Sequence, residues 1–182
     1  MTNTDVRLSE QNIQILKSCI GKTLDSITHE MFHFRNSVSQ QVAMQIEGSN
    51  VYILSFDEEL PYFGTIEDVS VLSVDTENNL PASPSPTTTP IGNTIKGITV
   101  VQEHQQLSID GVLEYDVWLT RGIIIDLGDR EIGFEKDTWL SLEIFIHKGT
   151  DVLTKFISTD TFVNGDWSDN CVATCEREII RL

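Results

Sequence analysis

The chain has 182 residues and carries 28 acidic against 12 basic side chains, which gives a formal net charge of −16 at pH 7. The electrostatic field of this negative charge repels phosphate backbones and anionic lipids, so we expect that the protein binds neither nucleic acid nor a membrane surface. The same field attracts a basic protein, and we expect a basic protein partner. An acidic surface that serves solubility alone is the alternative interpretation.

Targeting signals and cysteine chemistry are both weak in this sequence. No apolar run approaches the roughly 18 residues that span a bilayer, and the first residues lack the basic and apolar regions of a signal peptide, so we expect a cytoplasmic protein. Cys19, Cys171 and Cys175 are too few for a disulfide framework, and no further metal ligands are spaced near them. We expect no cofactor, and the oligomeric state is not indicated.

The first predicted element is a helix over residues 9–19. Ser9 can cap its start, apolar residues recur inside it at helical spacing, and Gly21 can end it in a left-handed conformation.

A nine-residue segment that follows this helix occurs twice. Residues 20–28 read IGKTLDSIT and residues 91–99 read IGNTIKGIT, with five identities. Each copy is followed by an alternating strand, a four-residue polar turn and a second alternating strand. We therefore predict that residues 20–57 and 91–137 form equivalent units, with ten additional residues in the second unit.

The segment between the copies differs in composition from both. Residues 75–90 hold four of the five prolines, which predicts an extended, solvated linker. The predicted organisation is a first β-rich half over residues 1–74, this linker, and a second β-rich half over residues 91–182, packed as one pseudo-symmetric domain.

The second half is rich in β-branched and aromatic residues separated by turn residues. Asp110-Gly111 and Asn164-Gly165 tolerate the positive φ of two-residue hairpins. Further strands are predicted over residues 118–127, 132–136, 142–147 and 152–158. The predicted fold class is mainly β (α+β), with antiparallel sheets or an open barrel built from two duplicated halves, and one N-terminal helix.

One short motif points to catalysis. His29-Glu30-Met31-Phe32-His33 fits the His-Glu-x-x-His pattern of zinc metalloproteases, in which a helix brings both imidazoles to one ion and the glutamate acts as general base. Apolar residues between Leu24 and Val38 recur at a spacing that allows such a helix. The duplicate stretch, residues 100–104, predicts a strand instead, which places the two histidines about 13 Å apart. We expect no zinc site; a zinc-dependent hydrolase with His29, His33 and Glu30 is the alternative.

The candidate binding residues are acidic or aromatic. Carboxylates at equivalent turns of the two halves could gather around Ca²⁺, although no loop shows the ligand order of a calcium motif. Tryptophans in the second half are interface anchors if they are exposed. We predict a non-enzymatic, acidic protein-binding module, such as an immunity-type inhibitor or adaptor for a basic partner. The predicted binding residues are Glu58, Glu59, Asp126, Asp129, Trp118 and Trp139.

Overall fold

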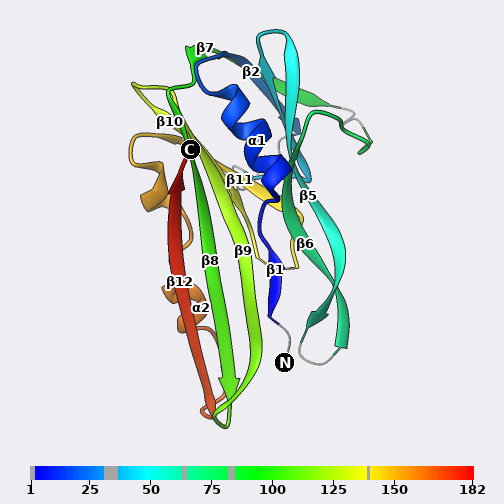
Figure 1. The fold of residues 1–182 in the computed structure, drawn as a ribbon, viewed down its shortest axis with the longest axis vertical. Helices are drawn as coiled ribbons and strands as arrows, with labels where there is room; N and C mark the ends of the chain where they lie inside the picture. The colour runs from blue at the N-terminus through cyan, green and yellow to red at the C-terminus, as the bar shows by residue number, and fades with distance from the viewer. Residues whose placement is uncertain (1–2, 31–36, 63–64, 82–84, 139) are drawn as a thin grey trace.

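The computed structural model describes residues 3–30, 37–62, 65–81, 85–138 and 140–182 (Figure 1). The described strands form two sheets, antiparallel apart from one short parallel strand, and they do not close into a barrel. The predicted mainly β fold class with one N-terminal helix is therefore confirmed. None of the described helices is long and apolar enough to cross a membrane.

The larger sheet has the strand order β12-β8-β9-β10-β11-β3, and β1 pairs in parallel with β9. Its strands are β1 (Thr4–Val6), β3 (Ser37–Ser39), β8 (Gly97–Ile109), β9 (Val112–Asp126), β10 (Glu131–Lys136), β11 (Glu143–Gly149) and β12 (Cys171–Arg181). The smaller sheet has the order β6-β5-β4-β2-β7. Its strands are β2 (Thr23–Glu30), β4 (Gln41–Ile46), β5 (Ser49–Tyr62), β6 (Thr65–Asp75) and β7 (Pro86–Thr94).

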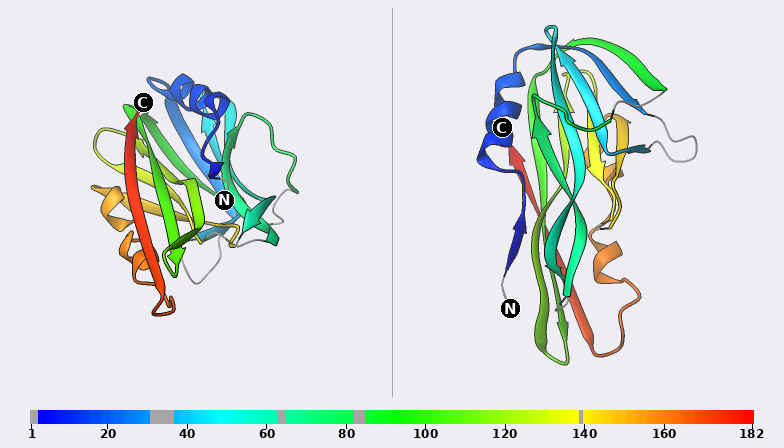
Figure 2. Two further views of the ribbon diagram at one scale, coloured as in Figure 1. Left: turned by 60° about the horizontal axis from the view of Figure 1, so that its bottom comes forward. Right: turned by 90° about the vertical axis from the view of Figure 1, so that its right-hand side faces the viewer.

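Helix α1 (Glu10–Cys19) forms where the sequence predicts it. The Ser9 side chain accepts a hydrogen bond from the Asn12 backbone, and the Asn12 side chain accepts one from the Ser9 backbone, so the first turn is capped reciprocally. The side-chain amide nitrogen of Asn12 also donates to the backbone carbonyl of Val74 in β6 at 2.7 Å. Leu16 and Cys19 of the helix are buried in the apolar core, and the end of β12 packs against the same core. The helix therefore covers the open side between the two sheets, next to the C-terminus (Figure 2).

The inner faces of the two sheets share one apolar core. Leu24 and Ile27 of β2 pack in the same cluster as Ile123 and Ile125 of β9 and Phe134 of β10. The two halves of the chain therefore bury a common interior, which at this length is more stabilising than two small separate cores.

The registers of the two sheets agree with the alignment of the two sequence segments. In the smaller sheet β2 pairs with β4, and β4 pairs with β5; in the larger sheet β8 pairs with β9, and β9 pairs with β10. One residue from each of the three strands forms a triplet of directly opposed residues. These triplets are Ile27, Met44 and Val51 in the smaller sheet and Ile98, Ile125 and Ile132 in the larger. The offset is 71 positions in the first strand and 81 in the next two. The additional residues belong to the longer β8–β9 hairpin, which turns at Asp110-Gly111 as predicted.

Residues 150–170 cross the outer face of the larger sheet, and here two predictions are wrong. The strand predicted over 152–158 is instead the 3₁₀ helix η1 (Val152–Lys155), because Glu131 caps the Val152 amide and Val152 packs with Phe156 on the sheet. The predicted Asn164-Gly165 hairpin is instead the end of the helical turn α2 (Asp160–Val163), where Asn164 donates to the Asp160 carbonyl.

The proline-rich segment and the first polar turn also differ from expectation. Residues 86–90 of the predicted linker belong to edge strand β7, which pairs with β2; an edge position tolerates proline because one side of the strand needs no donor. The turn between β4 and β5 has two residues, Glu47 and Gly48, rather than four, and both adopt positive φ.

Gly122 on β9 leaves no room for a side chain, because the backbone of β10 and the Phe156 ring of the crossing segment (residues 150–170) both lie against it. A Cβ there would lie 2.4 Å from the Phe134 carbonyl oxygen and 2.8 Å from the Phe156 ring. We predict that Gly122→Ala lowers the free energy of unfolding by about 1–3 kcal/mol in chemical denaturation, because backbone must shift.

The matched control is Gly97→Ala, whose Cβ would meet nothing within 4 Å and whose φ is not in the left-handed range. It should stay within about 0.5 kcal/mol of the wild type. Equal effects of the two substitutions would contradict the close packing of the β10 backbone and the Phe156 ring around Gly122.

Candidate binding site

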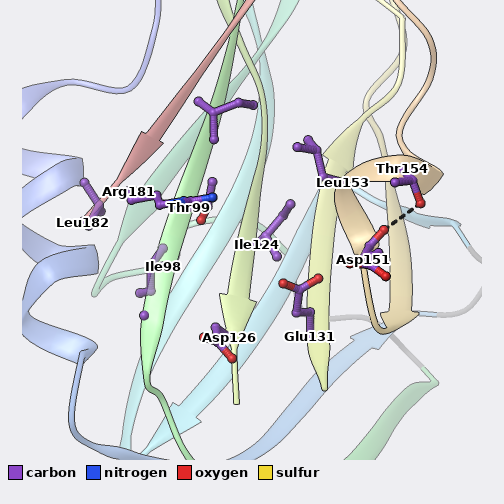
Figure 3. A pocket seen from close by; sticks show the side chains of 12 residues that line it. Ile98, Thr99, Ile124, Asp126, Glu131, Asp151, Leu153, Thr154, Arg181 and Leu182 are labelled. Carbon is purple, nitrogen blue, oxygen red and sulfur yellow. Dashed lines mark hydrogen bonds between the residues drawn. The ribbon is translucent and has the colours of Figure 1, made fainter. Parts of the chain in front are cut away.

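Three carboxylates from different segments line one open cavity of about 550 Å³ on the outer face of the larger sheet (Figure 3). Asp126 ends β9, Glu131 begins β10, and Asp151 precedes η1. Asp151 has a φ of +52°, a conformation that aspartate tolerates better than most residues. The segment 150–170 thus adds a third acidic group to the two presented by the sheet.

Asp126 and Glu131 lie directly opposite each other across the β9–β10 hairpin. One oxygen of each is used locally: Asp126 accepts from the Gly128 amide and Glu131 from the Val152 amide, each at 2.7 Å. Like charges directly opposite in a sheet are destabilising. The pair therefore concentrates negative charge at the cavity at some cost in stability.

The remaining lining of the cavity is mainly apolar, with one basic residue. Ile124, Leu153 and Ile179 are among the apolar lining residues. Arg181 of β12 lies on the far side from the carboxylates (Figure 3). Among the described residues, no group of three His, Cys, Asp or Glu side chains is arranged to hold a metal ion. The chemistry of the site is that of carboxylates beside apolar surface, which suits the charged end and the aliphatic stem of a lysine or arginine side chain.

The other predicted binding residues lie elsewhere. Asp129 is exposed in the β9–β10 turn and does not line the cavity. Glu58 and Glu59 lie at the far end of the molecule, on an extension of β5 and β6 that we call the acidic arm (residues 55–62 and 65–72) (Figure 1). The acidic groups of the two halves therefore do not gather at one site.

Trp118 is half-buried rather than exposed. His104 stacks on its ring, with centroids 4.4 Å apart and planes 7° apart, and the Arg7 guanidinium carbon lies 4.7 Å from its centroid. Its ring thus contacts side chains of β8 and of the residue that follows β1, and its role as a binding residue stays a prediction. Trp139 lies outside the described residues.

The first two residues of the candidate zinc motif, His29 and Glu30, belong to strand β2. Adjacent residues of a strand point to opposite faces, and His29 is the buried one. Burial lowers the pKa of His29, which favours the neutral ring. His33 lies outside the described residues. The position of His29 corresponds in register to Val100 of β8, so its side chain occupies a core position.

A buried ionic network missed by sequence reasoning lies under residues 150–170. Glu103 of β8, only 1% exposed, accepts from Arg121 of β9 at 2.7 and 3.1 Å and from Arg177 of β12 at 2.5 and 3.1 Å. Burial opposes its charged form, but the two arginines outweigh burial and lower the pKa of the carboxyl. Near Glu103, burial raises the pKa of the Cys175 thiol to about 12, which makes this cysteine a poor nucleophile.

A second buried charge, Lys136, joins the two sheets. Its Nζ donates to the Ser70 hydroxyl of β6 at 2.7 Å and to the carbonyls of Thr138 and Ser141 at 2.7 and 3.3 Å. Burial, followed by the charge of Arg121, lowers the pKa of Lys136 to about 7. A lowered lysine pKa occurs at catalytic sites, but these three partners give Lys136 a structural role.

A scan against models of known protein families, a search of curated proteins and a search of solved structures each found no match. The interpretation of the site therefore depends on its geometry.

We predict that Glu103→Gln lowers the free energy of unfolding by about 3 kcal/mol, because it leaves two buried or half-buried guanidinium groups without a counterion. Glu176→Gln, an exposed change on β12, is the control and should stay within about 0.5 kcal/mol of the wild type. Denaturant titration of both variants measures the difference. If Glu103→Gln proved neutral, the network would not hold the sheet and the crossing segment together.

We also predict that stability rises with pH above neutrality. Lys136 has a folded pKa of about 7 and a reference value of 10.5, so between these values the unfolded chain binds more protons and raising the pH favours the folded state. The slope is at most about 1.4 kcal/mol per pH unit.

The measurement is made between pH 7 and 8.5. Above pH 9.0, the reference pKa of cysteine, the raised pKa of Cys175 means that the folded chain binds more protons, so raising the pH there lowers stability. Denaturant titrations of wild type and Lys136→Met across this window should show the rise only in the wild type. A flat profile in the wild type would show that Lys136 stays charged when buried.

Proposed function

We propose that this protein is a non-enzymatic binding module for a basic protein, of the kind formed by an immunity-type inhibitor or an adaptor, and that the carboxylate cavity receives a lysine or arginine of the partner. The observation that carries the proposal is the opposed pair of Asp126 and Glu131, with Asp151 at the same cavity.

In the smaller sheet, the residues equivalent to Asp126 and Glu131 are uncharged. Gln45 and Asn50 lie directly opposite each other across the β4–β5 hairpin, each 81 positions before Asp126 and Glu131. We infer from this shared register, and from the sequence repeat, that the two hairpins descend from one duplicated unit. A neutral pair is therefore compatible with the hairpin, and we infer that the negative charge of the second pair serves binding, while a Glu131 oxygen also accepts from the Val152 amide.

The acidic arm provides long-range attraction for the same partner. Residues 55–72 contain five acidic and no basic side chains, and Glu59 lies directly opposite Asp68. Ile66 on the arm is 73% exposed and Phe56 is 39% exposed. Carboxylates beside exposed apolar groups suit a basic partner that also buries apolar surface, with the charges speeding encounter.

The double substitution Asp126→Asn with Glu131→Gln tests the proposal. Both changes keep an oxygen that can accept from Gly128 and Val152, so the cavity keeps its shape while the charge repulsion is relieved. Stability should be unchanged or rise by a few tenths of a kcal/mol. Capture of the basic partner from native cell extract should weaken by about tenfold or more, because a desolvated cation loses its counterion.

The matched control is Glu114→Gln with Glu176→Gln, which removes the same two charges at exposed positions away from the cavity. It should retain the partner. The proposal fails if both double variants capture the same proteins equally well, or if the captured proteins are not basic.

Neutralising Glu58 and Glu59 should affect association more than dissociation, because exposed charges on the arm act through the screened long-range field. With the captured partner, Glu58→Gln with Glu59→Gln should slow association at low salt and flatten its salt dependence, as measured by surface-based kinetics. If the association rate of the wild type did not change with salt concentration, the claim that the acidic arm speeds association electrostatically would be wrong.

A further inference from the structure

A second cavity of about 230 Å³ lies between the larger sheet and residues 157–167. Its floor is formed by buried side chains of β8 and β9, including Glu103, Gln105, Tyr115 and Arg121. Phe162 and Trp167 of the crossing segment contribute its aromatic walls. This cavity is separate from the carboxylate cavity in its lining residues and in its chemistry.

The charged side chains of the floor are engaged in hydrogen bonds. Both oxygens of Glu103 are bound by Arg121 and Arg177, and the Gln105 amide donates to the same carboxylate at 2.9 Å. The Tyr115 hydroxyl donates to the Gln105 carbonyl oxygen at 3.2 Å. A charged ligand would lose its hydration here, and the charged groups of the floor are already engaged by hydrogen bonds, so the floor favours an uncharged ligand.

The walls favour a flat ring. Tyr115 and Phe162 lie with centroids 5.8 Å apart and tilted by 32°, and Phe162 meets Trp167 edge to face at 5.5 Å. At these spacings the three rings are in contact and form one continuous aromatic wall, so a further ring that lies against this wall gains contacts of the same kind. An engineered apolar cavity of about 150 Å³ holds benzene, so a cavity of this size accommodates a larger, bicyclic ring.

The cavity is preformed because its wall is fixed at Ile157. The Ile157 amide donates to Glu135 at 2.6 Å, and its carbonyl accepts from Arg177 at 2.5 Å. Preformed pockets with aromatic lining and a few fixed polar groups are typical of small-molecule sites. We propose that this cavity binds a small uncharged aromatic molecule of about the size of indole, with its polar edge on the Gln105 and Tyr115 side.

The test uses the full-length, isotopically labelled protein titrated with indole and followed by amide NMR. Indole should shift the signals of the Gln105 side chain, the Thr161 amide and the Trp167 indole N–H, with a dissociation constant on the order of 0.1–1 mM for so few atoms. Thr161→Phe, which places a ring in the cavity, should weaken binding by about tenfold or more. Ser158→Leu fills the same space and serves if the first variant does not fold.

Thr154→Phe at the carboxylate cavity is the control and should bind indole as the wild type does. The proposal is overturned if millimolar indole shifts no signal at the cavity, or if a folded cavity-filling variant binds indole as tightly as the wild type. It is also overturned if glucose binds and indole does not, or if benzoate binds more tightly than indole, because the site would then suit a sugar or an anion.

Discussion

Three buried or half-buried carboxylates hold residues 150–170 against the outer face of the larger sheet, and both cavities depend on this attachment. Glu131 binds the Val152 amide, Glu135 binds the Ile157 amide, and Glu103 orients Arg177 toward the Ile157 carbonyl. Without these bonds the crossing segment would have buried backbone groups that lack partners, at a cost of about 1–3 kcal/mol each. The attachment brings Asp151 to the carboxylate cavity and Phe162 to the aromatic one.

In the β9–β10 hairpin, the residues that suit the proposed binding role lower stability. The core between the sheets is apolar and shared, and its hairpins have the same register in both halves. Asp126 and Glu131 place two negative charges opposite each other where Gln45 and Asn50 are neutral, and Glu131 also accepts from the Val152 amide. A local disagreement between what the fold needs and what the sequence contains is expected at functional positions.

Local signals in the sequence were sufficient for the helix, the fold class and the Asp110-Gly111 hairpin, because capping residues, alternation and turn chemistry act over a few positions. They were insufficient for residues 152–163, where Val152 and Phe156 look like strand residues but pack from short helical turns held by distant carboxylates. The partners of Glu103 lie 18 and 74 positions away, so no spacing rule identifies them. The one signal in the sequence is Arg121, a charged residue in the largely apolar stretch 117–125 of β9.

Amide hydrogen exchange at Val152 and Ile157 tests most directly whether the carboxylates hold the crossing segment. Both amides donate to buried or half-buried carboxylates, so we predict that they exchange only through openings nearly as costly as global unfolding. Exchange at the rate of an exposed loop would contradict the attachment and, with it, the geometry of both cavities.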